Sequence, residues 1–329
     1  MPLISELDVR EFRGVKHCAK PIKFSNFTVL IGRNNSGKSS VLEAMSLLPY
    51  PFDTSLHHIG MSKVQLLNFL HQNTMDNKVN NLLYRYSGSA EVDYTYMDNE
   101  LNLVLDQTGR FNLSHRGEGK KESLGSFIIE KEEERNKEVV LIPNNSEFLS
   151  KLINVLGDDQ CREGLSKSGS TVAVTKEIIN SCVNDVFSEI LWDGGKIRLR
   201  KEYSDGSLSY IHLNDLGEGI KKAAVIALAL EFFRPKLVLW DDFEGAAHPT
   251  LIKRVMEWLA AKEWQVVMST HSIDVLKDII DIGPEDAQII ICKKDNDDVL
   301  YHHAFDMESF EKLFYSNTDP RMLVDDLGL

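Results

Sequence analysis

The segment Gly32-Arg33-Asn34-Asn35-Ser36-Gly37-Lys38-Ser39 fits the pattern G-x-x-x-x-G-K-[ST], between a short apolar run (residues 26–31) and a helical pattern. Its glycines let the backbone wrap around a phosphate, so that N–H groups and the start of the helix point toward negative charge. We expect Lys38 to reach the β- and γ-phosphates of a nucleotide and the Ser39 hydroxyl to bind Mg²⁺. The sequence therefore predicts a P-loop, whose expected nucleotide contacts are Gly32, Asn34, Asn35, Ser36, Gly37, Lys38, Ser39 and Ser40.

A second apolar strand, residues 236–240, ends in the carboxylates Asp241 and Asp242. A pair of aspartates at a strand end can be simple turn chemistry, but it is also the form of a Walker B motif. In that motif, Asp241 would hold the Mg²⁺ shell and Asp242 would orient or deprotonate the attacking water. His271 follows the next apolar strand and can bond the γ-phosphate. We therefore expect Lys38, Asp242 and His271 to carry the chemistry, and Ser39 and Asp241 to hold the metal.

The chain has 329 residues, of which 43% are hydrophobic and 26% charged, the ordinary balance of a soluble globular protein. This length suffices for one large α/β domain or a core with a second lobe. No apolar run approaches the roughly 18 residues of a membrane span, and the N-terminus lacks the pattern of a secretory signal. The four cysteines are scattered and form no CxxC. We therefore expect reduced thiols in a cytoplasmic protein without membrane contact.

The net charge of −13 bears on nucleic-acid binding. A protein that wraps nucleic acid usually carries a basic face, so any DNA contact must come from a local patch. One candidate patch spans residues 110–121 and includes Arg116, Lys120 and Lys121; the other comprises Lys196, Arg198, Arg200 and Lys201. A solvated surface is the simpler interpretation of both patches.

Strands alternate with helices of 10 to 15 residues in the last third of the chain, which predicts a mostly parallel sheet flanked by helices. With an antiparallel β lobe added, the fold class is α/β. The expected strands are residues 3–12, 26–31, 127–129, 139–142, 196–201, 208–213, 236–240, 265–269, 287–292 and 299–303, with a β-meander over 82–113 and a charged turn over 130–138. The expected helices are residues 38–48, 62–71, 146–156, 172–190, 219–233, 249–262 and 273–280, followed by a helical tail. We expect an ATPase core formed by residues 1–60 and 191–329, with an inserted lobe at 61–190.

Four segments resemble ABC-type ATPases. Asp241-Asp242-Phe243-Glu244-Gly245-Ala246-Ala247-His248-Pro249 resembles the DEPExxLHP run that joins Walker B to the D-loop, and Ser269-Thr270-His271-Ser272 resembles the H-switch. Val9-Arg10-Glu11-Phe12-Arg13-Gly14, with the P-loop, resembles the start of SMC, RecF and especially OLD-like ATPases. Leu216-Gly217-Glu218-Gly219-Ile220-Lys221-Lys222 resembles the ABC signature in the G-x-G form of OLD-like proteins. The motifs cover roughly residues 3–48 and 208–280.

This resemblance implies ATP and Mg²⁺ as cofactors and a head-to-tail homodimer with composite ATP sites. Gly217 and Gly219 of one chain would close on the ATP bound by the other. ATP would bring the chains together and hydrolysis would release them, in DNA maintenance or in defence against foreign nucleic acid. Only 58 residues follow His271, too few for the Toprim nuclease domain of OLD proteins. The Q-loop residue stays open among Gln65, Gln72 and Gln107.

Two departures from the family pattern bear on turnover. Asp242 stands where the family usually has glutamate, which implies a slow ATPase, and Gly217 stands where transporter-type signatures have serine. The alternative is a nucleotide-gated scaffold or sensor that hydrolyses little ATP and regulates a separate effector. A GTPase is disfavoured because far too many residues separate the P-loop from Asp242-Phe243-Glu244-Gly245, the match to DxxG. A small-molecule kinase is also disfavoured, because such an enzyme would need a lid and would lack the G-x-G signature found here before Walker B.

Overall fold

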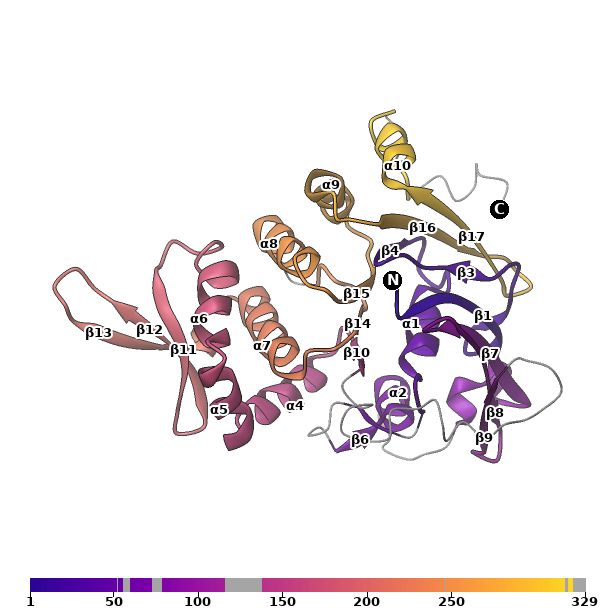
Figure 1. Cartoon of the computed structure of the whole chain (residues 1–329), viewed down its shortest axis with the longest axis horizontal. Helices are drawn as coiled ribbons and strands as arrows, with labels where there is room; N and C mark the ends of the chain where they lie inside the picture. Colours follow the sequence, from indigo (N-terminus) through magenta and orange to yellow (C-terminus); the bar gives the residue numbers. More distant parts are fainter. Residues whose placement is uncertain are drawn as a thin grey trace.

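The computed structural model describes residues 1–51, 53–55, 60–72, 79–115, 138–245, 247–316 and 319–321. The expected strand at 127–129, the charged turn at 130–138 apart from its last residue, and the basic residues Arg116, Lys120 and Lys121 lie outside the described residues. A 12-stranded sheet runs through the molecule in the order β10-β14-β15-β4-β16-β17-β2-β1-β7-β8-β9, with β3 paired to β1. Helices cover its parallel half, and a smaller sheet projects at the far left of Figure 1.

The parallel half of the sheet is its most apolar part. It consists of β10 (Val139–Ile142), β14 (Leu237–Trp240), β15 (Gln265–Ser269), β4 (Phe27–Ile31) and β16 (Ala287–Lys294), all paired in parallel. Every residue of the first four strands is buried. Strands covered on both faces have continuous apolar sequences, which is why the sequence predicted these strands closely. The parallel sheet with its helices confirms the α/β fold class.

The other half of the sheet is largely antiparallel. It contains β17 (Val299–Asp306), β2 (Val15–Cys18), β1 (Ile4–Phe12), β3 (Ile22–Lys23) and the predicted meander β7 (Ser89–Tyr96), β8 (Asn99–Asp106) and β9 (Phe111–His115). The meander joins the large sheet through β1. β17 runs antiparallel to β16, because the short turn between them allows only a hairpin. The expected largely parallel sheet is therefore found in β14, β15 and β16, whereas β17 is antiparallel to β16 and parallel to β2.

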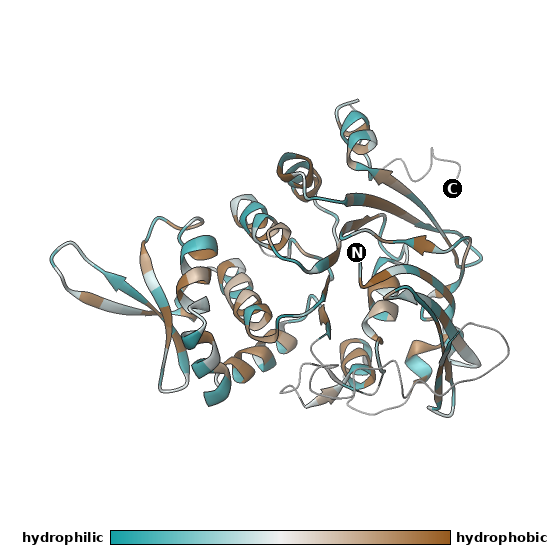
Figure 2. Ribbon diagram, viewed as in Figure 1, coloured by the Kyte–Doolittle hydropathy of each residue, from teal (hydrophilic) through white to brown (hydrophobic). Residues whose placement is uncertain are grey.

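Alternate residues of the parallel strands face two separate hydrophobic cores. Leu237 and Leu239 pack with α1 (Lys38–Ser46) and the meander, whereas Val238 and Trp240 pack on the opposite face. That second face is covered by α4 (Ser146–Leu156), α7 (Glu218–Phe233), α8 (Pro249–Ala260), α9 (Ile273–Ile282) and α10 (Met307–Phe314). Figure 2 shows hydrophobic residues gathered in the strands and on the inner sides of these helices. None of the described helices is both long and apolar enough to cross a bilayer.

The expected helix over residues 172–190 is wrong in its second half. The chain forms α5 (Asp159–Lys167), α6 (Ser170–Val174) and one π-helical turn (Thr175–Ile179), and then enters strand β11 (Phe187–Asp193). The Asn180 side chain bonds both the N–H and the C=O of Phe187, and so fixes the turn between helix and strand. β11 pairs with β12 (Lys196–Glu202), and β12 pairs with β13 (Leu208–His212), in a separate antiparallel sheet.

Residues 61–190 contribute to several parts of the fold. They include the meander, helix α2 (Lys63–Gln72), strand β10 at the end of the large sheet, and the helices α4 to α6. A two-stranded sheet, β5 (Thr54–Ser55) with β6 (Met61–Ser62), precedes α2. The expected domain bounds at residues 60 and 190 stay a prediction.

Candidate nucleotide-binding site

The loop between β4 and α1 requires glycine at two positions. A Cβ atom on Gly32, which has φ +150°, would lie 2.3 Å from the carbonyl oxygen of Cys292 and 2.7 Å from Ser36 Oγ. A Cβ atom on Gly37, at φ +94°, would lie 3.0 Å from Leu300 Cδ1. Glycine is therefore needed at Gly32, where the backbone passes close to Cys292, and at Gly37, where the backbone is left-handed. The loop leads directly into the N-terminus of α1, which favours an anion.

The Lys38 side chain folds back over this loop. Its Nζ donates to the carbonyl oxygens of Gly32 and Arg33, both at 3.0 Å. Burial lowers the pKa of Lys38, and the nearby acidic groups, which include Asp241 and Asp242, oppose that effect. A buried ammonium held by neutral carbonyls next to a helix N-terminus makes this a site that fits a phosphate.

Ser39 and Asp241 lie together, as the sequence predicted for metal ligands. The Asp241 carboxylate accepts hydrogen bonds from the hydroxyls of Ser269 and Ser39. Burial raises the pKa of Asp241, and these two hydrogen bonds oppose the rise. Among the described residues there is no cluster of three His, Cys, Asp or Glu side chains suited to a metal ion. A hydroxyl and a carboxylate fit Mg²⁺, which binds through one or two protein ligands together with phosphates and water.

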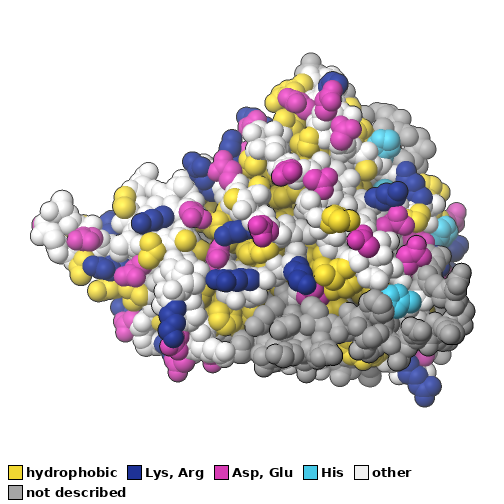
Figure 3. All heavy atoms as spheres, in the orientation of Figure 1, with side chains coloured by type: hydrophobic (Ala, Val, Ile, Leu, Met, Phe, Trp, Pro, Cys, Tyr) yellow, Lys and Arg dark blue, Asp and Glu magenta, His cyan; other side chains and the backbone are white. Residues whose placement is uncertain are grey.

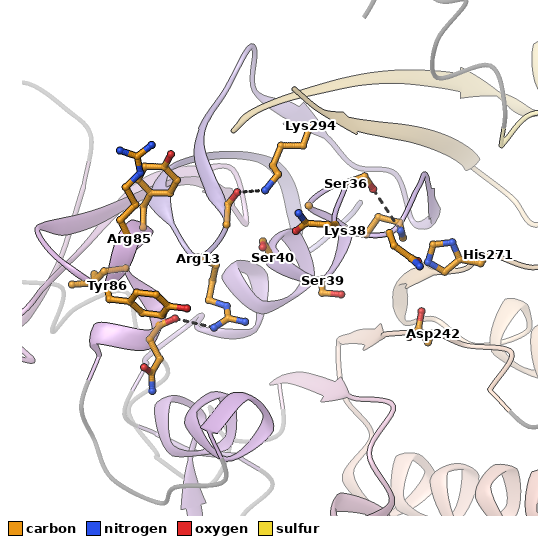
Figure 4. A pocket seen from close by; sticks show the side chains of 17 residues that line it. Arg13, Ser36, Lys38, Ser39, Ser40, Arg85, Tyr86, Asp242, His271 and Lys294 are labelled. Atoms are coloured by element: carbon orange, nitrogen blue, oxygen red, sulfur yellow. Dashed lines mark hydrogen bonds between the residues drawn. The ribbon is translucent and has the colours of Figure 1, made fainter. Parts of the chain in front are cut away.

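A cavity of about 540 Å³ opens over the P-loop. Asp242 and His271 line one end of it, and Arg13, Arg85 and Tyr86 lie at the opposite end (Figure 4). The predicted site residues that line the cavity are Asn34, Asn35, Ser36, Gly37, Lys38, Ser39, Ser40, Asp242 and His271. Gly32 and Asp241 do not line the cavity, but Asp241 accepts a hydrogen bond from Ser39, which does. The volume suits a ligand of nucleotide size.

Hydrogen bonds join the Walker B segment to the loop that carries His271. The Asp242 N–H donates to Ser269 Oγ at 2.9 Å. Glu244 accepts from Thr270 Oγ1 at 2.8 Å and from the N–H of His271 at 2.7 Å. Glu244 was not among the predicted site residues. Its signal in the sequence is its place in the DEPE-like run, in which we assigned a role to Asp241 and Asp242 but not to Glu244.

The rim opposite Asp242 was also missed. Arg13 Nη1 donates to the carbonyl of Asn81 at 2.8 Å, and Lys294 Nζ donates to the carbonyl of Gly14 at 2.8 Å. The remaining rim residues, Leu83, Tyr84, Arg85 and Tyr86, belong to an irregular segment in which Arg85 and Tyr86 have positive φ. Arg13 belongs to the segment 9–14, which resembles the start of SMC, RecF and OLD-like ATPases. Residues 83–86 could not be predicted, because an irregular segment has no periodicity in the sequence.

The signature glycines lie outside this cavity. Gly217 is the N-cap of α7, with nothing within 4 Å of an added Cβ atom, and Gly219 lies in the first turn of that helix. Neither Gln65 nor Gln107 lines the cavity; the Gln65 side chain instead accepts from the N–H of Ser62 at the start of α2. The side chain of Gln72 lies outside the described residues, so no Q-loop residue is assigned.

Acidic partners neutralise most of the described basic patch. Arg198 pairs with Asp193 at 3.0 Å, Arg200 pairs with Glu189 at 3.4 Å, and Lys201 pairs with Asp185. On the face drawn in Figure 3, Lys and Arg side chains are interspersed with Asp and Glu. Paired charges of this kind give little of the net positive potential that attracts DNA.

Comparison with known proteins agrees with this geometry. An AAA ATPase domain family matches residues 3–158, and an AAA domain family described as a putative AbiEii toxin of a type IV TA system matches residues 187–277. No curated protein matches the chain.

Several solved structures share the fold. One is an Smc head bound to the C-winged helix domain of ScpA, with a TM-score of 0.60 and 16% identity over 95% of this chain and 100% of that one. A second is the Smc head with an extended coiled coil from Pyrococcus furiosus, bound to the C-terminal domain of ScpA, with a TM-score of 0.56 and 12% identity over 96% of this chain and 99% of that one. The SMC head domain from Thermotoga maritima has a TM-score of 0.53 and 16% identity over 93% of this chain and 100% of that one.

The fold and these matches define an ATPase with a P-loop and an SMC-like head architecture. The two AAA family matches and the SMC-head fold agree with the resemblance to ABC-type ATPases of the SMC, RecF and OLD group that the motifs indicate.

Proposed function

We propose that this chain binds ATP with Mg²⁺, hydrolyses it slowly, and forms a homodimer on ATP binding. The observation that carries the proposal is the division of the motifs between two places. The cavity gathers the P-loop, Asp242 and His271, whereas Gly217 and Gly219 lie outside it. A second copy could therefore bring its own signature to the open side of the cavity.

Each residue at the cavity has one task in this proposal. Lys38 leaves the carbonyls of Gly32 and Arg33 and binds the β- and γ-phosphates. Ser39 and Asp241 hold Mg²⁺, which neutralises phosphate charge when it is bound. Asp242 orients the attacking water, and His271 contacts the γ-phosphate. Gly217, at the N-terminus of the partner's α7, completes the site, because a helix start without a side-chain cap and with open space around it suits an incoming phosphate.

The cellular role is proposed on the family matches. The toxin–antitoxin description of the second family favours defence against foreign nucleic acid over DNA maintenance. Two of the similar Smc heads are bound to domains of ScpA, which supports a separate effector protein as partner here. We place the protein in the cytoplasm, and we propose no DNA contact through residues 196–201, because three of the four cations there are paired.

The mass of the protein in solution tests the dimer. Wild type and Asp242→Asn are each measured without nucleotide and with ATP and Mg²⁺, with Lys38→Ala as the variant unable to bind phosphate. We expect ATP to convert monomer to dimer, and we expect Asp242→Asn to hold the dimer longer because its water is not activated. Bound ATP with no change in mass would refute the role of the signature in the partner's site.

A second candidate, a nucleotide-gated sensor with little hydrolysis, rests on the catalytic aspartate. Asp242 is one methylene shorter than glutamate, so its carboxylate has less reach toward the γ-phosphate. Phosphate release by wild type and Asp242→Asn separates the two functions. A turnover that falls at least tenfold in the variant supports the ATPase, and equal low rates in both proteins support the sensor.

A further inference from the structure

The peptide segment at His271 is held from two sides by residues distant in sequence. Glu244 accepts the N–H of His271 at 2.7 Å, and Arg321 Nη1 donates to the carbonyl of His271 at 2.8 Å. Glu244 belongs to the Walker B segment, whereas Arg321 follows α10 and is 50 residues away from His271. Both hydrogen bonds involve a charged side chain, and such bonds are stronger than those between neutral groups.

The Arg321 guanidinium is itself oriented. Asp319 accepts from Arg321 Nε at 3.0 Å and from Nη2 at 2.7 Å, which fixes the plane of the guanidinium and leaves Nη1 directed at the His271 carbonyl. The hydrogen bond from Arg321 lowers the pKa of Asp319. A planar donor fixed in this way positions its acceptor better than a flexible ammonium.

The rest of the His271 loop is tied as well. Thr270 Oγ1 donates to Glu244 and accepts from the N–H of Ser272 at 2.9 Å, and Ser272 Oγ caps α9 by accepting from Asp274 N–H. The loop therefore has its backbone fixed between β15 and α9. His271 then presents its side chain to the cavity, at the same end as Lys38 and Asp242 (Figure 4).

We propose that Glu244 and Arg321 are positioning residues that hold His271 where the γ-phosphate arrives, so that the preference for ATP over ADP depends on the C-terminal segment. This inference rests on the proposed contact between His271 and the γ-phosphate. ADP lacks that phosphate, so its binding is independent of the two hydrogen bonds.

Calorimetry with the magnesium complexes of ADP and of a non-hydrolysable ATP analogue tests the inference. Arg321→Ala is expected to lower the preference for the analogue over ADP about five- to tenfold, as loss of a charged hydrogen bond permits. Glu244→Gln, which keeps the size but loses the charge, and Asp319→Asn, which frees the guanidinium, are expected to give smaller losses in the same direction. Arg321→Lys should recover part of the preference. The control is Arg254→Ala, which removes an ion pair with Glu257 on α8, away from the cavity.

The double variant His271→Ala with Arg321→Ala shows whether Arg321 acts through His271. We expect it to match His271→Ala alone, because the two residues act on one contact. Additive losses, or an equal loss of ADP binding in Arg321→Ala, would overturn the inference. If His271→Ala itself leaves the preference unchanged, the proposed γ-phosphate contact fails. If His271→Ala lowers the preference but Arg321→Ala leaves it intact, that contact stands and the role of Arg321 fails.

Discussion

Gly32 is a residue at which a single added carbon cannot be accommodated. Its Cβ atom would lie 2.3 Å from the Cys292 carbonyl oxygen, which belongs to the neighbouring strand of the parallel sheet. We expect Gly32→Ala to lower the free energy of unfolding by more than about 2 kcal/mol and to abolish nucleotide binding. Gly88→Ala is the control, since Gly88 has φ +83° but open space around it, and should cost about 1 kcal/mol. Urea denaturation of both variants measures the difference; equal losses would mean that backbone strain, without the clash, explains the effect.

Some residues of the site can be recognised from short sequence motifs, whereas others depend on contacts between distant segments of the chain. The proximity of Lys38, Ser39 and Asp241 was predictable because it follows from their spacing within a strand, a loop and a helix. Glu244 and Arg321 were not, because their contacts with His271 depend on how distant segments fold together. Hydrogen bonds between parts of the chain this far apart have no periodicity in the sequence. Prediction from a single sequence therefore found the residues around the P-loop and missed the side chains that hold the backbone of His271.

At the scale of elements, apolar strands and strongly amphipathic helices were predictable. Residues 265–269 and 146–156 match β15 and α4 in both bounds. α5 was missed because only Cys161 and Leu165 of its nine residues are buried, too few for an apolar stripe. The error after residue 179 arose because Asn180 ends the helix through side-chain bonds to Phe187, which no hydrophobic pattern records.

Strand β17 contains a buried histidine that should make the fold sensitive to acid. Burial, together with the charges of Lys20 and His303, lowers the pKa of His302 to about 4. An unfolded histidine titrates near 6.5, so the unfolded chain binds the extra proton between these values. Stability is then full above pH 6.5 and is lost as the pH falls toward 4, by at most about 3 kcal/mol.

His302→Leu should remove this dependence. We expect the urea midpoint of wild type to fall more between pH 7.5 and pH 5 than that of the variant. His17→Gln, at an exposed position of β2, serves as the control and should keep the wild-type slope. Parallel slopes for wild type and His302→Leu would show that His302 does not contribute to acid sensitivity.

At the scale of the whole molecule, the class of fold was predictable but the order of the sheet was not. β10 pairs with β14, nearly a hundred residues further along the chain, and the meander extends the sheet from β1 at the other end. An apolar or alternating run shows that a strand exists, but it does not identify the neighbour of that strand. The two ends of the chain were assigned to one core only because their motifs follow the order known in ABC-type ATPases, and that division stays a prediction.

Because Gly217 lies outside the cavity of its own chain, its expected role can be tested only in a pair of chains. Gly217 caps α7 at φ −56°, with nothing within 4 Å of an added Cβ atom, so the single chain should tolerate a side chain there. Asp and Asn are equally good helix N-caps, so both Gly217→Asp and Gly217→Asn should fold as stably as wild type and bind one ATP per chain. If the partner's γ-phosphate meets this position, the aspartate repels it and the asparagine does not. We expect light scattering with ATP and Mg²⁺ to show dimers for wild type and Gly217→Asn, and monomers for Gly217→Asp. Equal dimerisation of the two variants would place the signature away from the second nucleotide, whereas the expected contrast would assign to Gly217 a role exerted only on the partner subunit.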